Sequence, residues 1–86
     1  MKPLDPQDVR ERLRTFITTE LIRDPAHRLG DADRIITGGL IDSFSLAELA
    51  VFVETAFGVY IPDPELTVAE MDTLDQIVAR VLRGAA

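Results

Sequence analysis

The stretch GGLIDSFSLAELAVFVETAFGVYIP, residues 38–62, predicts a helix with more apolar residues than one buried face requires. We expect this helix to run from Ser43 to about Phe57 and to end at Gly58, because glycine readily adopts the left-handed conformation of a helix C-cap. At about 100° per residue, one sector of the helix collects the side chains that we expect in the core. These are Leu46, Leu49, Ala50, Val53 and Phe57.

The opposite side of the same helix carries a second apolar group. Phe44, Ala47 and Val51 fall there, interleaved with Glu48 and Glu54. We expect this mixed apolar and acidic stripe to face water. The core does not need it, so it is a candidate surface for binding a partner.

A first helix is predicted from about Pro6 to Ile22, with Asp5 as its N-cap and Pro6 at its first position. Its helical spacing predicts a buried stripe of Val9, Leu13, Phe16, Ile17 and Leu21. We interpret the charged cluster on its other side as a solvated face; that cluster is Arg10, Glu11, Arg12 and Arg14.

Residues 23–41 have no sustained periodicity and contain one proline and three glycines, which predicts a long connection. A connection of this length in a small domain usually marks a function or a disordered segment. Its apolar side chains indicate that it is pinned to the core: Leu29, Ile35, Ile36, Leu40 and Ile41. We interpret Gly38 and Gly39 as a source of loop flexibility and not as a phosphate-binding element.

The C-terminal part predicts an irregular segment followed by a last helix. Ile61 is expected to anchor the segment, with a short helix within residues 64–71, and Thr73 and Gln76 have the spacing of a capping box. The buried stripe of the last helix is predicted to be Leu74, Ile77, Val78, Val81 and Leu82. No segment has the pattern of a strand. We therefore expect an all-α fold, a small four-helix bundle with three longer helices, one short helix and a long first loop.

Length and charge restrict the possible functions. A chain of 86 residues forms one domain, here residues 1–86 with a core of about 5–83, without room for a separate catalytic domain, so we expect no enzymatic activity. The net charge of −6 argues against nucleic acid or an anionic membrane surface as a partner. Residues 42–86 carry eight acidic side chains and only Arg80 and Arg83 as basic ones, which favours a basic protein as the partner.

Other residue types exclude further classes. The chain has no cysteine and a single histidine, His27, so the sequence predicts neither a disulfide framework nor a metal site. The N-terminal residues lack an apolar signal-peptide core, and no apolar run approaches the length of a membrane span. We expect a monomeric, cytoplasmic protein.

The dipeptide Asp42-Ser43 has three interpretations. Asp and Ser are both favoured N-cap residues, so the pair can serve only to start a helix. A hydrolase with Ser43 as nucleophile, His27 as base and an aspartate would need oxyanion donors and a closed pocket, which the small domain and the missing nucleophile elbow disfavour. In the third interpretation Ser43 accepts a phosphate-linked group, beside free backbone N–H groups at the positive end of the helix dipole.

The segment GLIDSF followed by LAELAVFVETAFGVYIPD resembles the acyl carrier protein family. The resemblance covers roughly residues 5–83 and includes the long first connection and the capped last helix. It implies that Ser43, next to Asp42, carries 4'-phosphopantetheine, attached by a phosphopantetheinyl transferase that uses coenzyme A and magnesium. It also implies that the thiol of this arm holds cargo as a thioester, while the protein itself catalyses nothing.

Two residues depart from the fatty acid biosynthesis carriers of the family. Phe44 stands where the family usually has leucine or a similar aliphatic residue, and Ser45 stands where those carriers commonly have an acidic one. The motif looks more like that of the aminoacyl and D-alanyl carriers. The resemblance thus implies a stand-alone carrier of a dedicated aminoacyl, lipid or secondary-metabolism pathway, with a ligase or transferase and downstream biosynthetic enzymes as partners. The alternative is a helical adaptor that binds a protein through the exposed stripe and carries no cofactor.

Overall fold

Four α-helices form the fold, and the computed structural model describes residues 4–85. They are α1 (Pro6–Phe16), α2 (Ser45–Phe57), α3 (Val68–Met71) and α4 (Leu74–Ala85), with a π-helical turn at Ile17–Leu21 and a 3-10 turn at Asp63–Glu65. Residues 4–85 contain no strand. The expected all-α bundle of three longer helices and a short one, with a long first loop, is confirmed.

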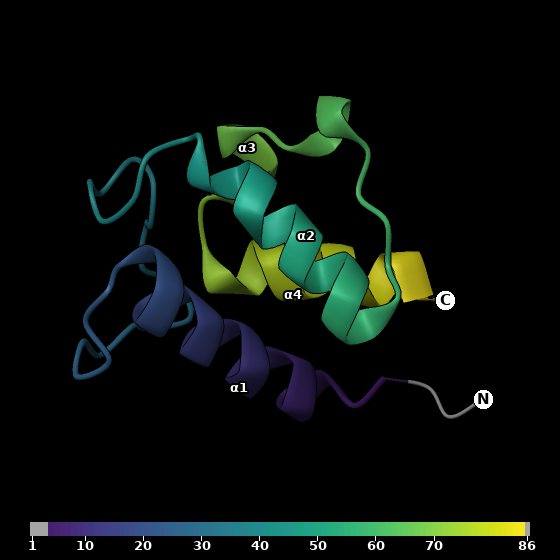
Figure 1. Ribbon diagram of the computed structural model, residues 1–86, viewed down its shortest axis with the longest axis horizontal. Coiled ribbons are helices and arrows are strands. Elements are labelled where there is room, and N and C mark those ends of the chain that lie inside the picture. Colours follow the sequence, from purple (N-terminus) through teal and green to yellow (C-terminus); the bar gives the residue numbers. More distant parts are fainter. Residues whose placement is uncertain (1–3, 86) are drawn as a thin grey trace.

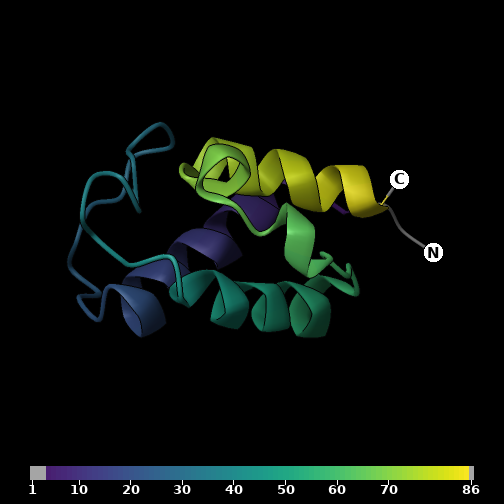
Figure 2. The same ribbon diagram turned by 90° about the horizontal axis from the view of Figure 1, so that it is seen from above.

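The helices enclose one core. Figures 1 and 2 show α2 and α4 on opposite sides of the molecule, with α1 packed against α4. The fully enclosed side chains include those predicted from helical spacing on three helices, such as Leu13, Leu49 and Ile77. Ala50, Phe57 and Leu82 are half-buried at the edge of this core.

The first helix starts and ends at defined contacts. The Asp5 carboxylate accepts a hydrogen bond of 3.1 Å from the Gln7 amide, which confirms the predicted N-cap. At the other end, the Thr18 hydroxyl donates to the Arg14 carbonyl at 2.9 Å and competes with the helical bond to that oxygen. The last turn is therefore wider, π-helical, and the left-handed Arg23 (φ 63°) then reverses the chain.

The long loop, residues 23–41, is held against the rest of the fold. Leu29 and Ile35 are buried in the core, and Ile36, Leu40 and Ile41 pack against it, as predicted. Figures 1 and 2 place this loop at the same end of the molecule as the first turn of α2. The loop therefore determines where the Asp42-Ser43 dipeptide lies.

A single carboxylate, that of Asp72 at the end of α3, binds the middle of this loop. One oxygen of Asp72 accepts from the amides of Ile36 (2.8 Å) and Thr37 (3.0 Å), and the other accepts from the Thr37 hydroxyl (2.6 Å). The Asp72 carbonyl also accepts from the Ile35 amide at 2.7 Å. We call this set of four bonds the Asp72 clamp.

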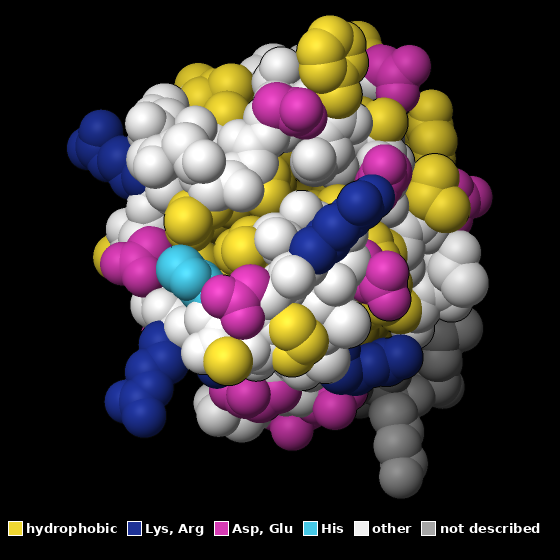
Figure 3. Space-filling model, turned by 60° about the vertical axis from the view of Figure 1, so that its left-hand side comes forward, with side chains coloured by type: hydrophobic (Ala, Val, Ile, Leu, Met, Phe, Trp, Pro, Cys, Tyr) yellow, Lys and Arg dark blue, Asp and Glu magenta, His cyan; other side chains and the backbone are white. Residues whose placement is uncertain are grey.

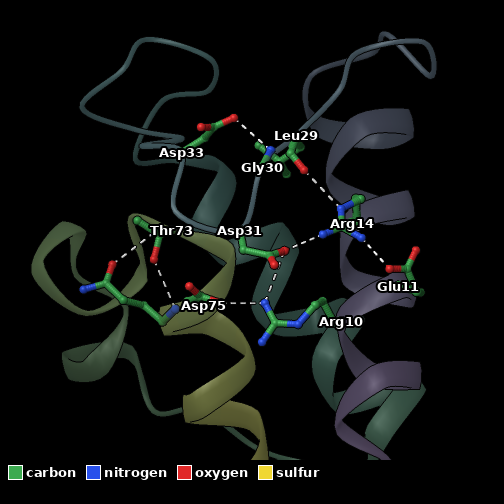
Figure 4. Close-up of polar contacts among 10 residues, drawn as sticks. Arg10, Glu11, Arg14, Leu29, Gly30, Asp31, Asp33, Thr73 and Asp75 are labelled. Carbon is green, nitrogen blue, oxygen red and sulfur yellow. Dashed lines mark hydrogen bonds and ion pairs between the residues drawn. The ribbon is translucent and has the colours of Figure 1, made fainter.

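Two arginines of the α1 charge cluster, predicted to be a solvated face, are only 24% and 26% exposed and also bind other segments. Arg10 forms ion pairs with Asp75 (2.6 Å) and Asp31 (3.3 Å), and Arg14 pairs with Asp31 while donating to the Leu29 carbonyl at 3.1 Å (Figure 4). The hydrogen bond to Asp75 is the main cause of the raised pKa of Arg10. These side chains turn from α1 toward the loop and α4 because carboxylates and a carbonyl of those segments face them.

The two adjacent glycines form a turn that requires glycine. A Cβ atom at Gly38 would lie 2.1 Å from the Arg34 carbonyl oxygen, so no larger residue fits there. Gly39 has a φ of 82°, in the left-handed region that glycine tolerates best. The amides of Leu40 and Ile41 then return to the Ile35 carbonyl, at 2.9 and 3.0 Å.

The last helix begins at the predicted capping box. The Gln76 amide donates to the Thr73 hydroxyl at 3.1 Å, and the Thr73 amide donates to the Gln76 side-chain oxygen at 3.0 Å. The same oxygen accepts from the Asp72 amide at 2.9 Å. The start of α4 therefore also holds the residue that clamps the loop.

Candidate functional site at the start of the second helix

The second helix begins two residues later than predicted. Ser43 and Phe44 form a turn, and α2 starts at Ser45. The Asp42 carboxylate accepts from both the amide (3.2 Å) and the hydroxyl (3.3 Å) of Ser45. The same amide also donates to the Asp42 carbonyl at 3.2 Å, so Asp42 holds the helix start through both its side chain and its main chain. Ser43 lies in the turn that precedes α2.

The Ser43 side chain lies on the surface of this turn. Within residues 4–85 its hydroxyl makes no hydrogen bond, and the amides of Ser43 and Phe44 have no protein acceptor. Its carbonyl accepts from Leu46 at 3.2 Å. The hydroxyl does not cap the helix, so it is free to react, and two unpaired N–H groups lie beside it.

Ser43 and His27, the pair of the hydrolase interpretation, are not joined by a hydrogen bond in the described part of the chain. His27 is half-buried, and its amide donates to the Asp24 carbonyl at 2.9 Å. The described residues also contain no group of three or more metal-ligating side chains.

The stripe predicted on the outer side of α2 is exposed. Phe44 is 85% and Val51 65% exposed, and Ala47, Glu48 and Glu54 also lie on the surface. Large apolar side chains so accessible to water are candidates for contact with a partner. Figure 3, which views the loop side of the molecule, shows hydrophobic atoms between acidic and basic side chains.

These residues line two separate hollows on either side of α2. The first, of about 300 Å³, is mostly polar and lies beside the Ser43 turn. It is lined by Asp42, Phe44, Ser45 and Glu48 together with Glu20, Leu21 and Arg23 from the end of the first helix. The second, of about 220 Å³, is lined by Ala47, Ala50, Val51, Glu54, Tyr60, Ile61, Asp63 and Leu66.

Sequence reasoning missed the contribution of other segments to both hollows. Among residues 4–85, Arg23 is the only cationic side chain that lines the first hollow, where it lies among the carboxylates of Glu20, Asp42 and Glu48. Tyr60 is 66% exposed and extends the apolar surface beyond Val51. The position of Tyr60, an aromatic residue just after the Gly58 cap, could have indicated its role from the sequence. Nothing in the local sequence, in contrast, places Arg23 near Asp42.

Comparison of the sequence with models of known families and with curated proteins finds no match. No helix among residues 4–85 has the length and apolar character needed to cross a bilayer. The geometry of the Ser43 turn is therefore the main basis for a functional proposal.

Proposed function

We propose that the chain is a carrier protein that holds acyl or aminoacyl cargo as a thioester on 4'-phosphopantetheine attached to Ser43. In the attachment, the Ser43 oxygen loses its proton and bonds to the phosphorus of phosphopantetheine. The pyrophosphate bond of coenzyme A breaks, and adenosine 3',5'-bisphosphate leaves. The arm supplies the thiol that the chain lacks, since the sequence has no cysteine. A phosphopantetheinyl transferase, a loading ligase or transferase, and biosynthetic enzymes are the partners in this proposal.

The surroundings of Ser43 suit a phosphodiester. The amides of Ser43 and Phe44 are free to donate to phosphate oxygens, and the positive end of the α2 dipole lies next to them. Arg23 in the adjacent hollow adds a cation on the same surface. The Asp42 carboxylate, which would repel a phosphate, is bonded to Ser45.

One observation carries the proposal: the structure separates the two serines of the motif. Ser45 is half-buried and its hydroxyl is bonded to Asp42, whereas the Ser43 hydroxyl is exposed and unbonded within the described residues. A modifying enzyme can reach Ser43 without opening the helix. The exposed Phe44 and Val51 lie on the surface around it, where a partner can cover them.

The test is incubation with coenzyme A, magnesium and a broad-specificity phosphopantetheinyl transferase, followed by intact-mass and peptide mass spectrometry. We expect one phosphopantetheine per chain, on Ser43. Ser43→Ala should abolish the addition, while the matched control Ser45→Ala should keep it.

Two results would contradict the proposal. An unmodified wild-type chain in the presence of an active transferase would favour the adaptor, which uses the exposed stripe without a cofactor. Modification at Ser45 would show that the hydrogen bond to Asp42 does not protect that hydroxyl.

A further inference from the structure

An aromatic groove lies between α1 and α2, apart from the hollow that Tyr60 lines. Its volume is about 390 Å³, and it is lined by Glu11, Arg12, Thr15, Phe16, Thr19, Glu20 and Phe52. Phe16 and Phe52 stack with their ring centroids 4.2 Å apart and their planes at 10°. Both rings are only half-buried, so the groove has an aromatic floor open to solvent.

The groove lies next to the polar hollow beside the Ser43 turn, with which it shares one lining residue. Glu20 lines both the groove and the polar hollow beside Ser43. Ser45, Glu48 and Phe52 are spaced along one stripe of α2, because residues three and four apart share a helix face. From Ser45 to Phe52 this stripe extends about 10 Å along the axis.

The reach of the proposed arm covers this separation. Phosphopantetheine is about as long as four or five extended residues, or ~15 Å. A group on its end can therefore lie over Phe16 and Phe52 while the phosphate stays on Ser43.

The charges around the groove favour an amino group on the cargo. Glu11 is paired with Arg14, and Arg12 lies 5.0 Å from the centre of the Phe57 ring and 3.9 Å from Asp8. Glu20, in contrast, forms no ion pair within residues 4–85. An unpaired carboxylate beside an aromatic floor matches a ligand with an ammonium group and an apolar body.

We propose that the groove between α1 and α2 binds the cargo, and that the cargo is an aminoacyl group with an apolar side chain. Its ammonium group pairs with Glu20 and its side chain packs on Phe16 and Phe52. This inference rests on the proposed attachment of the arm to Ser43.

The experiment loads the wild-type chain through the transferase with three stable coenzyme A analogues, bearing phenylalanyl, 3-phenylpropionyl or acetyl groups. NMR then records amide shifts and nuclear Overhauser contacts between the cargo ring and the phenylalanine rings. The phenylalanyl group should contact Phe16 and Phe52 and shift the amides of Thr15 and Thr19. The 3-phenylpropionyl group should give weaker contacts, and the acetyl group none.

Matched variants separate the two contacts. Glu20→Gln should lower the bound fraction of the phenylalanyl group by roughly two- to fivefold, the range for an exposed ion pair, and leave 3-phenylpropionyl unchanged. Glu70→Gln, an exposed glutamate on α3 that lines neither the groove nor the stripe, is the control and should change neither. Phe52→Leu should weaken both aromatic cargoes. Circular dichroism checks that each variant is folded.

The outcomes distinguish this inference from the function on which it rests. If the wild-type chain takes up no phosphopantetheine, both the carrier proposal and the cargo-binding inference are overturned. A chain that is modified on Ser43 but shows no contact between cargo and groove leaves the carrier proposal intact and overturns the inference. Contacts at Ala47, Val51 and Tyr60 overturn it too, because the cargo would then occupy the other hollow. Equal effects of Glu20→Gln and Glu70→Gln would rule out the specific ion pair.

Discussion

Three polar residues at the start of α2, Asp42, Ser43 and Ser45, have different roles. The Asp42 carboxylate accepts hydrogen bonds from the amide and the hydroxyl of Ser45. Ser43 lies between these residues, and its hydroxyl makes no hydrogen bond within residues 4–85. An unmodified serine in this place contributes little to stability. Its exposure is what makes it suitable for attachment chemistry.

At this scale we predict that capping depends on Asp42 and not on Ser43. Asp42→Ala should lower the free energy of unfolding by about 1 kcal/mol, as the loss of an N-cap does. Ser43→Ala should change it by about 0.5 kcal/mol or less, because no hydrogen bond is lost. Urea titrations of the unmodified proteins measure both free energies of unfolding. A larger decrease for Ser43→Ala than for Asp42→Ala would show that Ser43, and not Asp42, caps the helix.

At the scale of the element, α2 presents two chemically different surfaces. Leu46, Leu49 and Val53 are buried, whereas Phe44 and Val51 are exposed by more than half of their area. Burial stabilises the fold, while the outer surface leaves apolar area in water. A partner that covers the outer surface during function would explain why α2 has more apolar residues than the core needs.

The two surfaces should respond differently to truncation. Leu49→Ala removes a side chain that is 1% exposed and should destabilise the protein by about 2–5 kcal/mol. Val51→Ala should cost less than about 0.5 kcal/mol, because Val51 is largely solvated. Equal shifts of the denaturation midpoint would mean that the buried side of α2 is assigned wrongly.

The outer surface should also govern loading of cargo. Glu48→Lys should slow loading at low substrate mainly by reducing association with a basic partner, and the difference from wild type should shrink as salt is added. Val51→Asp should instead weaken the bound complex by placing a charge in its apolar centre. Stopped-flow loading rates at several salt concentrations test this. Wild-type rates for both variants with a cognate partner in low salt would exclude a role for this surface.

At the scale of the whole molecule, the long loop is positioned by contacts with distant segments. The Asp72 clamp joins it to the junction of α3 and α4, and Asp31 joins it to Arg10 and Arg14 on α1. Residues 35–41 then close on the Ile35 carbonyl just before Asp42. Ser43 is thus presented from a loop held at both ends.

The clamp predicts a particular response to acid. The hydrogen bond from the Thr37 hydroxyl is the main cause that lowers the pKa of Asp72 from its ordinary value of 3.8. A lowered folded-state pKa contributes stability that is present above the unfolded value and is lost as pH falls through the folded value. Asp72→Asn should therefore cost about 1–3 kcal/mol at neutral pH, and its difference from wild type should shrink below about pH 4.

Thermal unfolding of wild type and Asp72→Asn from neutral to acidic pH checks this prediction. Asp63→Asn is the control, because Asp63 is exposed and its carboxylate makes no hydrogen bond within residues 4–85. A constant difference between Asp72→Asn and wild type down to pH 2 would show that the charge of Asp72 does not hold the loop.

The sequence by itself determined the features that depend on near neighbours. Helical spacing identified the buried stripes, and Asp5, Gly58 and the Thr73–Gln76 pair identified helix ends, because these interactions span at most a few residues. Only the tertiary structure decided which face of the loop meets Asp72, that Arg10 and Arg14 pair with Asp31 of the loop, and that Phe16 and Phe52 line a groove. These contacts join residues more than thirty positions apart in most cases, as between Ile36 and Asp72. Their geometry is the sum of how all the helices pack, so no local pattern encodes it.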